Sequence, residues 1–531
     1  MVCSALLSCG TADSPSQAPS HAPGSALPAL PERVAAADLP RGPERPARTL
    51  SLALVGEVRG EFAPCGCPTL PYGGFLRRAR QLEALRAEGP LFHLDAGELL
   101  VKGNITTRAE ERAARAALMD RLSAAVGLDA WSLGPTDIET LGPDNVQRVI
   151  PNGAARIGAG WQPLQDGQAA PAPAVVLSRD GLRIGVIGVA SAQGEEGQGW
   201  RARPPAEAAE AALQTLPPDL DLVVALGDLD EGVADALALV PGIALVLSTQ
   251  GRSLDAPHSP LRPDGSPGAL VVEAPDRGRF LQVVRLQLGA PPGQPAVLLP
   301  DEAAWRDRLT ARAVAAARGA PEPAAPAFTE AGRGRNLAMV ELLPLAADLE
   351  LGPPTSDEER AVLALLAEHR QKSVELAQIA VEAPPTPAEP GFAGGGACAR
   401  CHSREVARWA LTDHANAWLD LVRADRGAGP PAHTDPECAR CHSTGFAQPG
   451  GLAALDGPDL NRLKAVQCEA CHGPMRGHPD APAVEARAIT AARCVGCHDA
   501  ANSPDFNFER YLPLASCQGG APALLPPGTQ P

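Results

Sequence analysis

Long apolar runs and positive charge are both scarce in this sequence. No stretch of the 531 residues reaches the roughly 20 consecutive apolar residues that a transmembrane helix needs. Lysine and arginine number 46 against 62 aspartate and glutamate residues, so the formal net charge is -16. A surface of this sign argues against nucleic-acid binding, and a partner attracted by charge would present a basic face. The acidity is equally expected of a surface that only keeps the protein soluble.

Apolar runs of strand length are present in the first part of the chain. The whole length predicts two or three domains, because 531 residues exceed one hydrophobic core. From residue 49 to about 300, strand-like runs alternate with Ala/Leu/Arg-rich helical stretches, which predicts an α/β layered domain. A hairpin is expected to turn at Asp180-Gly181, and "DLVVALGDL", "IALVLST", "GALVVEA" and "LQVVRLQL" predict buried strands.

Strand signals end after this domain. Residues 301–391 are expected to form a helical connector and linker, with helices over 301–318 and 356–382 and a break at "EAPPTPAEPG". Residues 392–515 predict a mainly α-helical domain of short helices, and 516–531 a tail. The Pro/Ala/Ser-rich residues 10–48 predict a disordered tether.

One pentapeptide, Cys-x-x-Cys-His, recurs four times in the C-terminal segment, as in "ECARCHSTGF". With 13 Cys and 11 His in the chain, random placement would give well under one copy. Two thiols at this spacing can each add to a vinyl group of one haem, and the adjacent His then reaches the iron. The motifs therefore predict four covalent c-type haems, each with its own proximal histidine. They comprise Cys398, Cys401 and His402; Cys438, Cys441 and His442; Cys468, Cys471 and His472; and Cys494, Cys497 and His498.

Structural zinc is the sharpest competing interpretation of paired Cys-x-x-Cys units. Zinc gives no reason for a histidine directly after every second cysteine, and disulfide scaffolds do not repeat this pentapeptide. Haem is favoured over both.

Three further histidines in the segment, His414, His433 and His478, are candidate distal ligands. Met475 is the only methionine there, so mostly bis-histidine ligation is expected, which implies comparatively low potentials. Three spare histidines for four irons predict one open coordination site. His369 and Cys517 are more distant candidates, which a helix-surface position and a loose thiol would equally explain.

Covalent haem attachment predicts export, because the maturation machinery for this motif works outside the bacterial cytoplasm. The first twenty residues lack the basic region and full apolar core of a secretory signal. Leu6-Leu7-Ser8-Cys9 resembles the lipobox of bacterial lipoproteins, so residues 1–9 are expected to be a truncated signal and Cys9 a lipidation site. This predicts a periplasmic or cell-envelope protein that touches the membrane only through a lipid anchor; a stray cysteine after a short apolar stretch is the alternative.

Residues 394–513 resemble the tetrahaem cytochrome c-554 family. The similar features are "SREVARWALTDHANAW" after the first motif, "DPECARCHSTGF", "VQCEACHGP" with His478 six residues beyond the motif's own histidine, and "CVGCHDAANSPDFNFERYLP". The resemblance implies a mainly helical module that passes electrons along packed haem pairs. It also implies three bis-histidine haems and one five-coordinate haem, the latter at the second motif.

Residues 49–298 resemble, more weakly, the metallophosphoesterase domain of bacterial 5'-nucleotidases, through "GGFLRRARQLEALR", "LDAGELL" and "LRIGVIGVAS". Active members hold two metals with Asp-x-His, Gly-Asp, Gly-Asn-His and Gly-His-x-His motifs. The matching positions here carry Glu57, Arg59, Glu98, Pro135, Thr136, Asp228, Gln250 and Arg252. Nearly every imidazole is missing and two arginines oppose cations, so phosphatase activity is not expected.

Cys65 and Cys67 in "FAPCGCP" lie where α/β sites gather, after the first strand. They are either a redox pair or soft-metal site, or inert structural thiols.

The sequence favours an exported electron carrier with redox protein partners over two alternatives. One is a haem enzyme that acts on a small nitrogen or sulfur species at the open iron, and the other is a thiol-based enzyme at Cys65 and Cys67.

Overall fold

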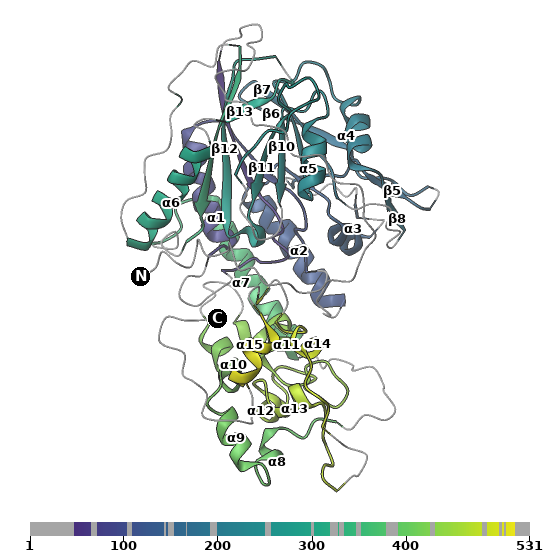
Figure 1. The fold of residues 1–531 in the computed structure, drawn as a ribbon, viewed down its shortest axis with the longest axis vertical. Helices are drawn as coiled ribbons and strands as arrows, with labels where there is room; N and C mark the ends of the chain where they lie inside the picture. The colour runs from purple at the N-terminus through teal and green to yellow at the C-terminus, as the bar shows by residue number, and fades with distance from the viewer. Residues whose placement is uncertain are drawn as a thin grey trace. The chain divides into compact units, whose positions relative to one another are not determined.

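The protein divides into two compact units, one formed by residues 1–102 and 119–359 and the other by residues 103–118 and 360–531 (Figure 1). The computed structural model describes residues 47–64, 72–102, 109–142, 145–146, 153–165, 167–191, 199–249, 256–291, 293–298, 302–318, 328, 334–346, 352–378, 391–424, 431–480, 486–498, 502–503 and 506–515. Each unit is described by itself.

The first unit is built on two sheets. A seven-stranded mixed sheet has the order β13-β14-β12-β1-β2-β3-β4, and a five-stranded sheet has the order β11-β10-β9-β7-β6. The strands of the larger sheet are β1 (Arg48–Val55), β2 (Leu91–Asp95), β3 (Ala130–Ser132), β4 (Ala155–Ile157), β12 (Phe280–Leu288), β13 (Ala296–Leu298) and β14 (Asn336–Pro344). Those of the smaller sheet are β6 (Ala174–Arg179), β7 (Leu182–Gly188), β9 (Leu222–Asp228), β10 (Leu245–Thr249) and β11 (Leu270–Ala274). A separate pair joins β5 (Trp161–Pro163) to β8 (Trp200–Ala202).

The core of this unit lies between the two sheets. One apolar cluster joins fully buried residues of β1 and β12 to those of β7, β9 and β10, including Leu54, Val284 and Leu247. A second cluster packs the other face of the smaller sheet against α4 (Pro205–Leu213) and α5 (Glu231–Ala238), which flank that sheet in Figure 1. The remaining helices of the unit include α1 (Phe75–Glu88), α3 (Pro135–Leu141) and α6 (Glu302–Arg318). The predicted α/β layering is confirmed.

The predicted hairpin is confirmed at its turn. β6 and β7 pair antiparallel with Arg179 opposite Leu182. The two turn residues have positive φ angles, 51° at Asp180 and 74° at Gly181. A two-residue turn of this kind matches the twist of the flanking strands, and Asp-Gly tolerates the backbone conformation that it requires.

The larger sheet extends past the boundary expected at residue 300. β14 pairs antiparallel with β12 along its whole length, from Asn336 opposite Leu288 to Pro344 opposite Phe280. The segment 301–391 is therefore not purely a helical connector. Its predicted helices are present as α6 and α7 (Asp357–Gln378), while the strand between them was missed.

The described part of the second unit beyond residue 391 contains short helices and no named strand, as the sequence predicted. They are α8 (Gly395–Cys398), α9 (Ser403–Trp409), α10 (Asp413–Arg423), α11 (Pro436–His442), α12 (Leu460–Leu463), α13 (Cys468–His472), α14 (Ala491–Cys494) and α15 (Phe508–Ala515). Two helices, α2 (Ala109–Ala125) and α7, each contain residues of both units. The apolar core here is small and centres on Phe392, Trp418 and Leu463.

Candidate haem-binding segment and front-unit pocket

Each Cys-x-x-Cys-His motif lies on or beside a short helix. The second and third motifs lie within α11 and α13, whereas α8 and α14 end at the first cysteine of the first and fourth motifs. A helical turn continues there, because the amide of His402 donates to the carbonyl oxygen of Cys398 and that of His498 to Cys494, both at 2.8 Å. Side chains three and four positions apart share one face of a helical turn. The backbone thus presents both thiols and the histidine of a motif on one side.

The eight motif cysteines are free thiols and form no disulfide with one another. The first and third motifs lie together, because the thiols of Cys398 and Cys468 are hydrogen-bonded, which lowers the pKa of Cys398 to about 7. The disulfide alternative therefore finds no support among these residues.

Two proximal histidines have the orientation that a metal ligand needs. The Nδ1 atom of His442 lies 2.6 Å from the carbonyl oxygen of Ala417 on α10. A carbonyl oxygen only accepts, so Nδ1 carries the proton and Nε2 keeps a free lone pair. The Nδ1 atom of His498 lies 3.2 Å from the hydroxyl oxygen of Ser503, a group that can accept from a protonated Nδ1 and can also donate. Such a bond fixes the tautomer and the ring orientation of a ligating histidine.

His414 faces His498 across a gap. Their ring centroids are 6.1 Å apart, and the ring planes are inclined by 54°. A metal–imidazole bond is about 2 Å, so two imidazoles on opposite sides of one iron have centroids roughly 6 Å apart. Burial lowers the pKa of His414, and the neighbouring His498 and His442 lower it further. A neutral imidazole is the ligating form, so the fourth motif and His414 together fit a bis-histidine haem.

The other two candidate distal histidines are placed differently. His433 lies in a 3-10 turn (Ala432–Thr434), and its ring meets Trp418 edge-on with centroids 6.5 Å apart. Its Nδ1 atom is buried and has no hydrogen-bond partner, which suits a nitrogen that takes a ligand. His478 lies beyond α13 at an exposed position, and His402 is exposed as well.

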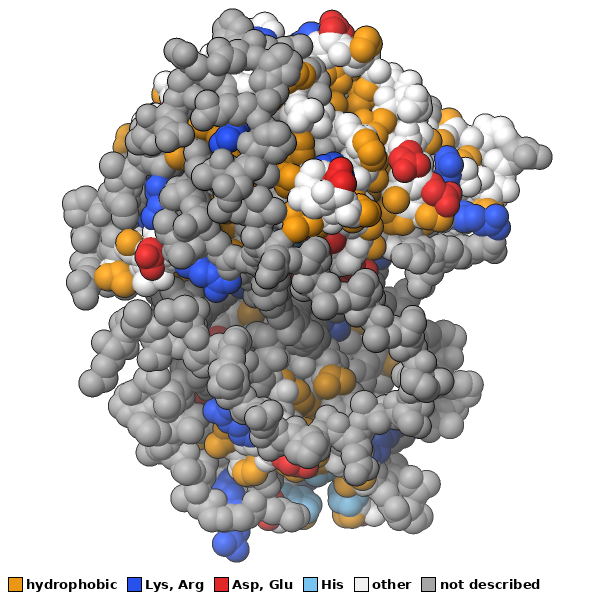
Figure 2. All heavy atoms as spheres, turned by 45° about the horizontal axis from the view of Figure 1, so that its top comes forward, with side chains coloured by type: hydrophobic (Ala, Val, Ile, Leu, Met, Phe, Trp, Pro, Cys, Tyr) orange, Lys and Arg blue, Asp and Glu red, His pale blue; other side chains and the backbone are white. Residues whose placement is uncertain are grey.

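Apolar side chains are exposed close to the motifs. Leu411 is 73% exposed, Val422 51% and Val495, between the two cysteines of the fourth motif, 47%. Histidines and apolar atoms reach the visible surface of the second unit together (Figure 2). Apolar side chains that are exposed next to thiols and imidazoles fit the faces of a porphyrin, which would cover them. The residues present therefore fit haem c.

Glu469, inside the third motif, is a structural residue that the sequence analysis missed. Its carboxylate is 1% exposed and accepts hydrogen bonds from the amides of Ala393 at 2.8 Å, Gly394 at 2.7 Å and Met475 at 2.8 Å. It ties the chain before the first motif to the third motif. The only signal in the sequence is an acidic residue in the variable part of the pentapeptide.

In the first unit, called the front unit below, four of the residues predicted at the degenerate phosphoesterase positions lie close together: Glu57, Arg59, Glu98 and Asp228. The loops after β1 and β2 are joined by backbone bonds from Glu57 to Gly97 at 2.8 Å and from Arg59 to Glu98 at 2.7 Å. The Arg59 guanidinium lies 3.0 Å from the Glu57 carboxylate. Asp228, at the end of β9, is hydrogen-bonded to Glu57; burial first, then Glu57 and Glu98, raise the pKa of Asp228 to about 8. Burial also raises the pKa of Glu98.

Pro135 and Thr136 lie at the start of α3, next to Glu98. The Thr136 amide donates to Glu98 at 2.9 Å, and α3 begins at Pro135. Asp137 is fully buried and accepts from the amides of Leu99 and Leu100, both at 3.0 Å. Cys9, Cys65, Cys67, Gln250, Arg252 and Cys517 lie outside the described residues.

The pocket does not fit a two-metal centre. Among the residues that the structure describes, no three His, Cys, Asp or Glu side chains form a group that could hold a metal ion. Carboxyl oxygen atoms of Glu57, Glu98 and Asp228 remain at these positions, but the Arg59 guanidinium lies 3.0 Å from Glu57.

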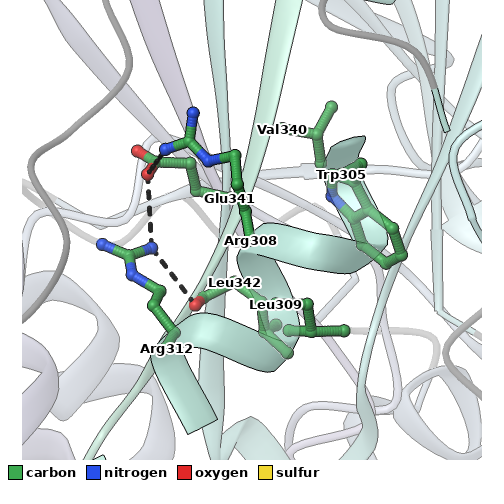
Figure 3. Close-up of a pocket in the computed structure, with 7 residues that line it drawn as sticks. All are labelled: Trp305, Arg308, Leu309, Arg312, Val340, Glu341 and Leu342. Atoms are coloured by element: carbon green, nitrogen blue, oxygen red, sulfur yellow. Dashed lines mark hydrogen bonds and ion pairs between the residues drawn. The ribbon is translucent and has the colours of Figure 1, made fainter. Parts of the chain in front are cut away.

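A shallow groove lies elsewhere in the first unit, between α6 and β14. Figure 3 shows Arg308 and Arg312 converging on Glu341 beside Trp305. Glu341 lies 3.2 Å from Arg308, 3.3 Å from Arg312 and 3.0 Å from Arg285. The groove contains neither a haem motif nor a residue of the front pocket, and its charged side chains tie α6 to the sheet.

None of the helices in the described part of the chain is long and apolar enough to cross a membrane.

Comparison with known proteins supports both halves of the sequence analysis. Residues 397–473 match the sequence model of the family described as cytochrome c554 and c-prime. A curated relative, cytochrome c-554 of Nitrosomonas europaea, is 35% identical over 98 residues, which are 17% of this chain and 41% of the relative. The match thus spans less than half of that relative. The solved reduced state of cytochrome c554 from the same organism aligns with 26% identity and a TM-score of 0.19, covering 21% of this chain and 66% of that one.

Two further solved structures are similar to a larger part of the chain. A 5'-nucleotidase precursor from Thermus thermophilus has 16% identity and a TM-score of 0.44, over 74% of this chain and 73% of that one. A calcineurin-like phosphoesterase from Bacillus subtilis has 14% identity and a TM-score of 0.41, over 62% and 99%. The predicted resemblances are confirmed: the second unit carries a segment similar to the cytochrome c554 family, which supports a haem c electron-carrying role, and the front unit is similar to 5'-nucleotidases and calcineurin-like phosphoesterases.

Proposed function

We propose that this protein is an exported multihaem c-type cytochrome that transfers electrons through four covalently bound haems. The observation that carries the proposal is the fourfold Cys-x-x-Cys-His motif, of which three copies fall inside the matched residues 397–473 and the fourth follows at 494. When bound, each haem supplies a one-electron iron couple. The protein attaches the haems through the paired thiols and holds each iron with the adjacent histidine.

Contacts between residues of different motifs indicate which of the haem sites are neighbours. The hydrogen bond between Cys398 and Cys468 brings the first and third motifs side by side. His498 and His414, whose ring centroids are 6.1 Å apart, would hold the iron of the fourth haem. A saturated bis-histidine iron exchanges electrons without binding a substrate, which favours a carrier.

The front unit has a docking or binding role in this proposal and no hydrolytic one. Its pocket opposes divalent cations, and the acidic chain suits redox partners with a basic docking face. Export to the periplasm or cell envelope, with Cys9 as lipid anchor, completes the proposal and rests on the haem motifs and the "LLSC" stretch.

A second function, a haem enzyme for a small nitrogen or sulfur species, is favoured by the count of histidines. His414 faces the fourth motif, which leaves His433 and His478 for three remaining irons. One five-coordinate iron could take a ligand. Nitric oxide titration tests for the open iron that this second function needs. Turnover of a small nitrogen or sulfur species by the purified protein separates the two functions, because a carrier would show none.

Mass spectrometry of the exported protein tests the haem count. We expect the mature mass to exceed that of the apoprotein by four haems, none of which acid-acetone extracts. Cys441→Ala should lose one haem and weaken the fold of the segment, because the porphyrin serves as its local core. Bound zinc without a Soret band would contradict the proposal.

A further inference from the structure

We propose that Phe506 and Tyr511 are positioning residues for the fourth haem, and that their rings hold the imidazole of His498 in one orientation toward the iron. The inference rests on the haem at the fourth motif, which is part of the proposed function. Both residues act through His498 and are not ligands themselves.

The rings of His498, Phe506 and Tyr511 form a group in which each ring contacts the other two. His498 and Phe506 are stacked, with ring centroids 4.8 Å apart and ring planes inclined by 15°. Tyr511 meets the His498 ring edge-on, at 5.9 Å and 72°, and the Phe506 ring at 5.1 Å and 70°. Aromatic rings favour stacked and edge-to-face arrangements at centroid distances of roughly 4.5–7 Å. The imidazole is therefore held on one face and on one edge.

The backbone fixes the positions of the two aromatic residues. The amide of Phe506 donates to the carbonyl oxygen of Ser503 at 3.0 Å, which forms a turn before α15. The side chain of Asn507 accepts from the amide of Arg510 at 3.0 Å and so caps the first turn of that helix. Tyr511 lies on the same turn, and its amide donates to the carbonyl oxygen of Asn507 at 2.9 Å. The turn and the cap thus place both rings.

The stacked ring restricts the one rotation that remains to a ligating imidazole. A histidine that binds iron through Nε2 can still turn about the metal–nitrogen bond. A ring parallel to the imidazole at 4.8 Å opposes that rotation, because the edge of the imidazole would move into it.

This restriction has an electronic consequence at the fourth haem. The ring planes of His414 and His498 are inclined by 54°. The angle between two axial imidazole planes affects the splitting of the iron d orbitals, and groups around a ligating histidine set its orientation. Phe506 and Tyr511 therefore fix this angle from the proximal side.

Electron paramagnetic resonance of the oxidised, haem-loaded full chain tests the inference. The largest g value of a low-spin haem depends on the angle between its axial imidazole planes, and the signal that is lost in His414→Ala identifies the fourth haem. We expect Phe506→Leu to shift and broaden this signal, because leucine fills space without a flat face. Tyr511→Leu should shift it as well. All haems should stay attached, since the thiols of the motif remain.

Conservative variants separate a positioning role from packing alone. Phe506→Tyr and Tyr511→Phe keep the flat rings and should leave the signal at its natural position. Phe280→Leu is the matched control, because Phe280 is stacked on Tyr72 in the first unit, with ring centroids 5.5 Å apart. It should leave the signal unchanged too.

A folded and fully loaded Phe506→Leu whose signal does not move would overturn the inference, as would an equal shift in Phe506→Tyr. Phe506→Met, which also lacks a flat ring, replaces Phe506→Leu if that variant does not load its haems, and Tyr511→Leu decides if neither does. Mass spectrometry gives the haem content of the same samples. A natural chain without haem at the fourth motif would overturn the proposed function as well, whereas four haems with an unmoved signal would overturn only the role of the two rings.

Discussion

At the scale of single residues, several carboxyl groups of the front unit have pKa values above those of the same groups in water. Burial raises the pKa of Asp95 to about 7 and that of Asp228 to about 8, from ordinary values of 3.8. Asp137 shifts in the same direction, again through burial. Protons bound to such groups at neutral pH stabilise the folded state, because the unfolded chain would release them.

The first prediction concerns Asp228. Its pKa is higher in the folded than in the unfolded chain, so its stabilising effect is complete below pH 3.8 and is lost as the pH rises to about 8. Asp228→Asn should flatten the fall in unfolding temperature between pH 5 and 8, because an amide still donates to Glu57 without ionising. Thermal unfolding followed by circular dichroism measures this. The fully exposed Asp264 is the control, and an equal flattening in Asp264→Asn would contradict the assignment.

The second prediction concerns His414. Removing its imidazole leaves His498 without the ring that faces it at 6.1 Å. His414→Ala should therefore convert one low-spin haem to high spin while all haems stay attached. Electron paramagnetic resonance of the oxidised protein gives the readout, with His258→Ala in the front unit as the control. An unchanged spectrum would mean that another residue is the sixth ligand of the fourth haem.

At the scale of elements, one buried carboxylate joins a helix to the larger sheet. Glu341 on β14 has a side chain that is 2% exposed, and it pairs with Arg308 and Arg312 on α6 and with Arg285 on β12. The two helix arginines are four residues apart and so project from one face of α6 (Figure 3). Removing the carboxylate takes away the acceptor that all three guanidinium groups share, and the side chains of Arg285 and Arg312 are only 13% and 14% exposed.

We predict that Glu341→Gln lowers the free energy of unfolding of the first unit by about 3 kcal/mol, the usual cost of breaking a buried ion pair. The control is Glu88→Gln, because Glu88 pairs with the same Arg285 but is 46% exposed. It should cost less than about 1 kcal/mol. Urea unfolding curves measure the free energy of unfolding of both variants. An equal loss in the two variants would show that the ion pairs of Glu341 contribute no more stability than a pair at the surface.

At the scale of the whole molecule, a segment similar to the cytochrome c554 family is combined with a front unit whose sheets resemble those of calcineurin-like phosphoesterases. Among the described residues, Glu57, Glu98 and Asp228 bring carboxyl groups together, and Arg59 lies over Glu57 at 3.0 Å. Metal-assisted hydrolysis ordinarily needs imidazole ligands as well, and a guanidinium opposes a cation.

We therefore expect the full chain to show no hydrolysis of nucleotides when supplied with manganese or zinc. The assay follows phosphate release, and Glu98→Ala is the control for any residual rate. Turnover that disappears in Glu98→Ala would show that the pocket is active.

The last prediction also concerns the whole molecule, and its subject is the haem with an open coordination site. The resemblance to the cytochrome c-554 family places the open iron at the second motif, with His442 as its proximal ligand. One haem should be high-spin in the natural protein and bind nitric oxide, while the others do not. A wholly low-spin spectrum would require a further ligand, and His369 would be the first residue to replace.

The sequence by itself determined the features that depend on local chemistry. The four pentapeptides need only their own spacing, and the hairpin needs only the two residues Asp180 and Gly181 at its turn. The apolar run of β10, which is buried along its whole length, predicted a strand. A strand that is covered on both faces needs apolar side chains at every position, so its sequence is a continuous apolar run.

Only the tertiary structure decided the features that depend on distant partners. β14 is a buried apolar run of strand length that the sequence analysis overlooked, and its place in the sheet rests on pairing with β12, which a local pattern does not specify. The role of Glu469 likewise comes from backbone groups that reach it from other segments. His414 faces His498 because folding brings α10 to the fourth motif, and long-range packing of this kind leaves no periodic signal in the sequence.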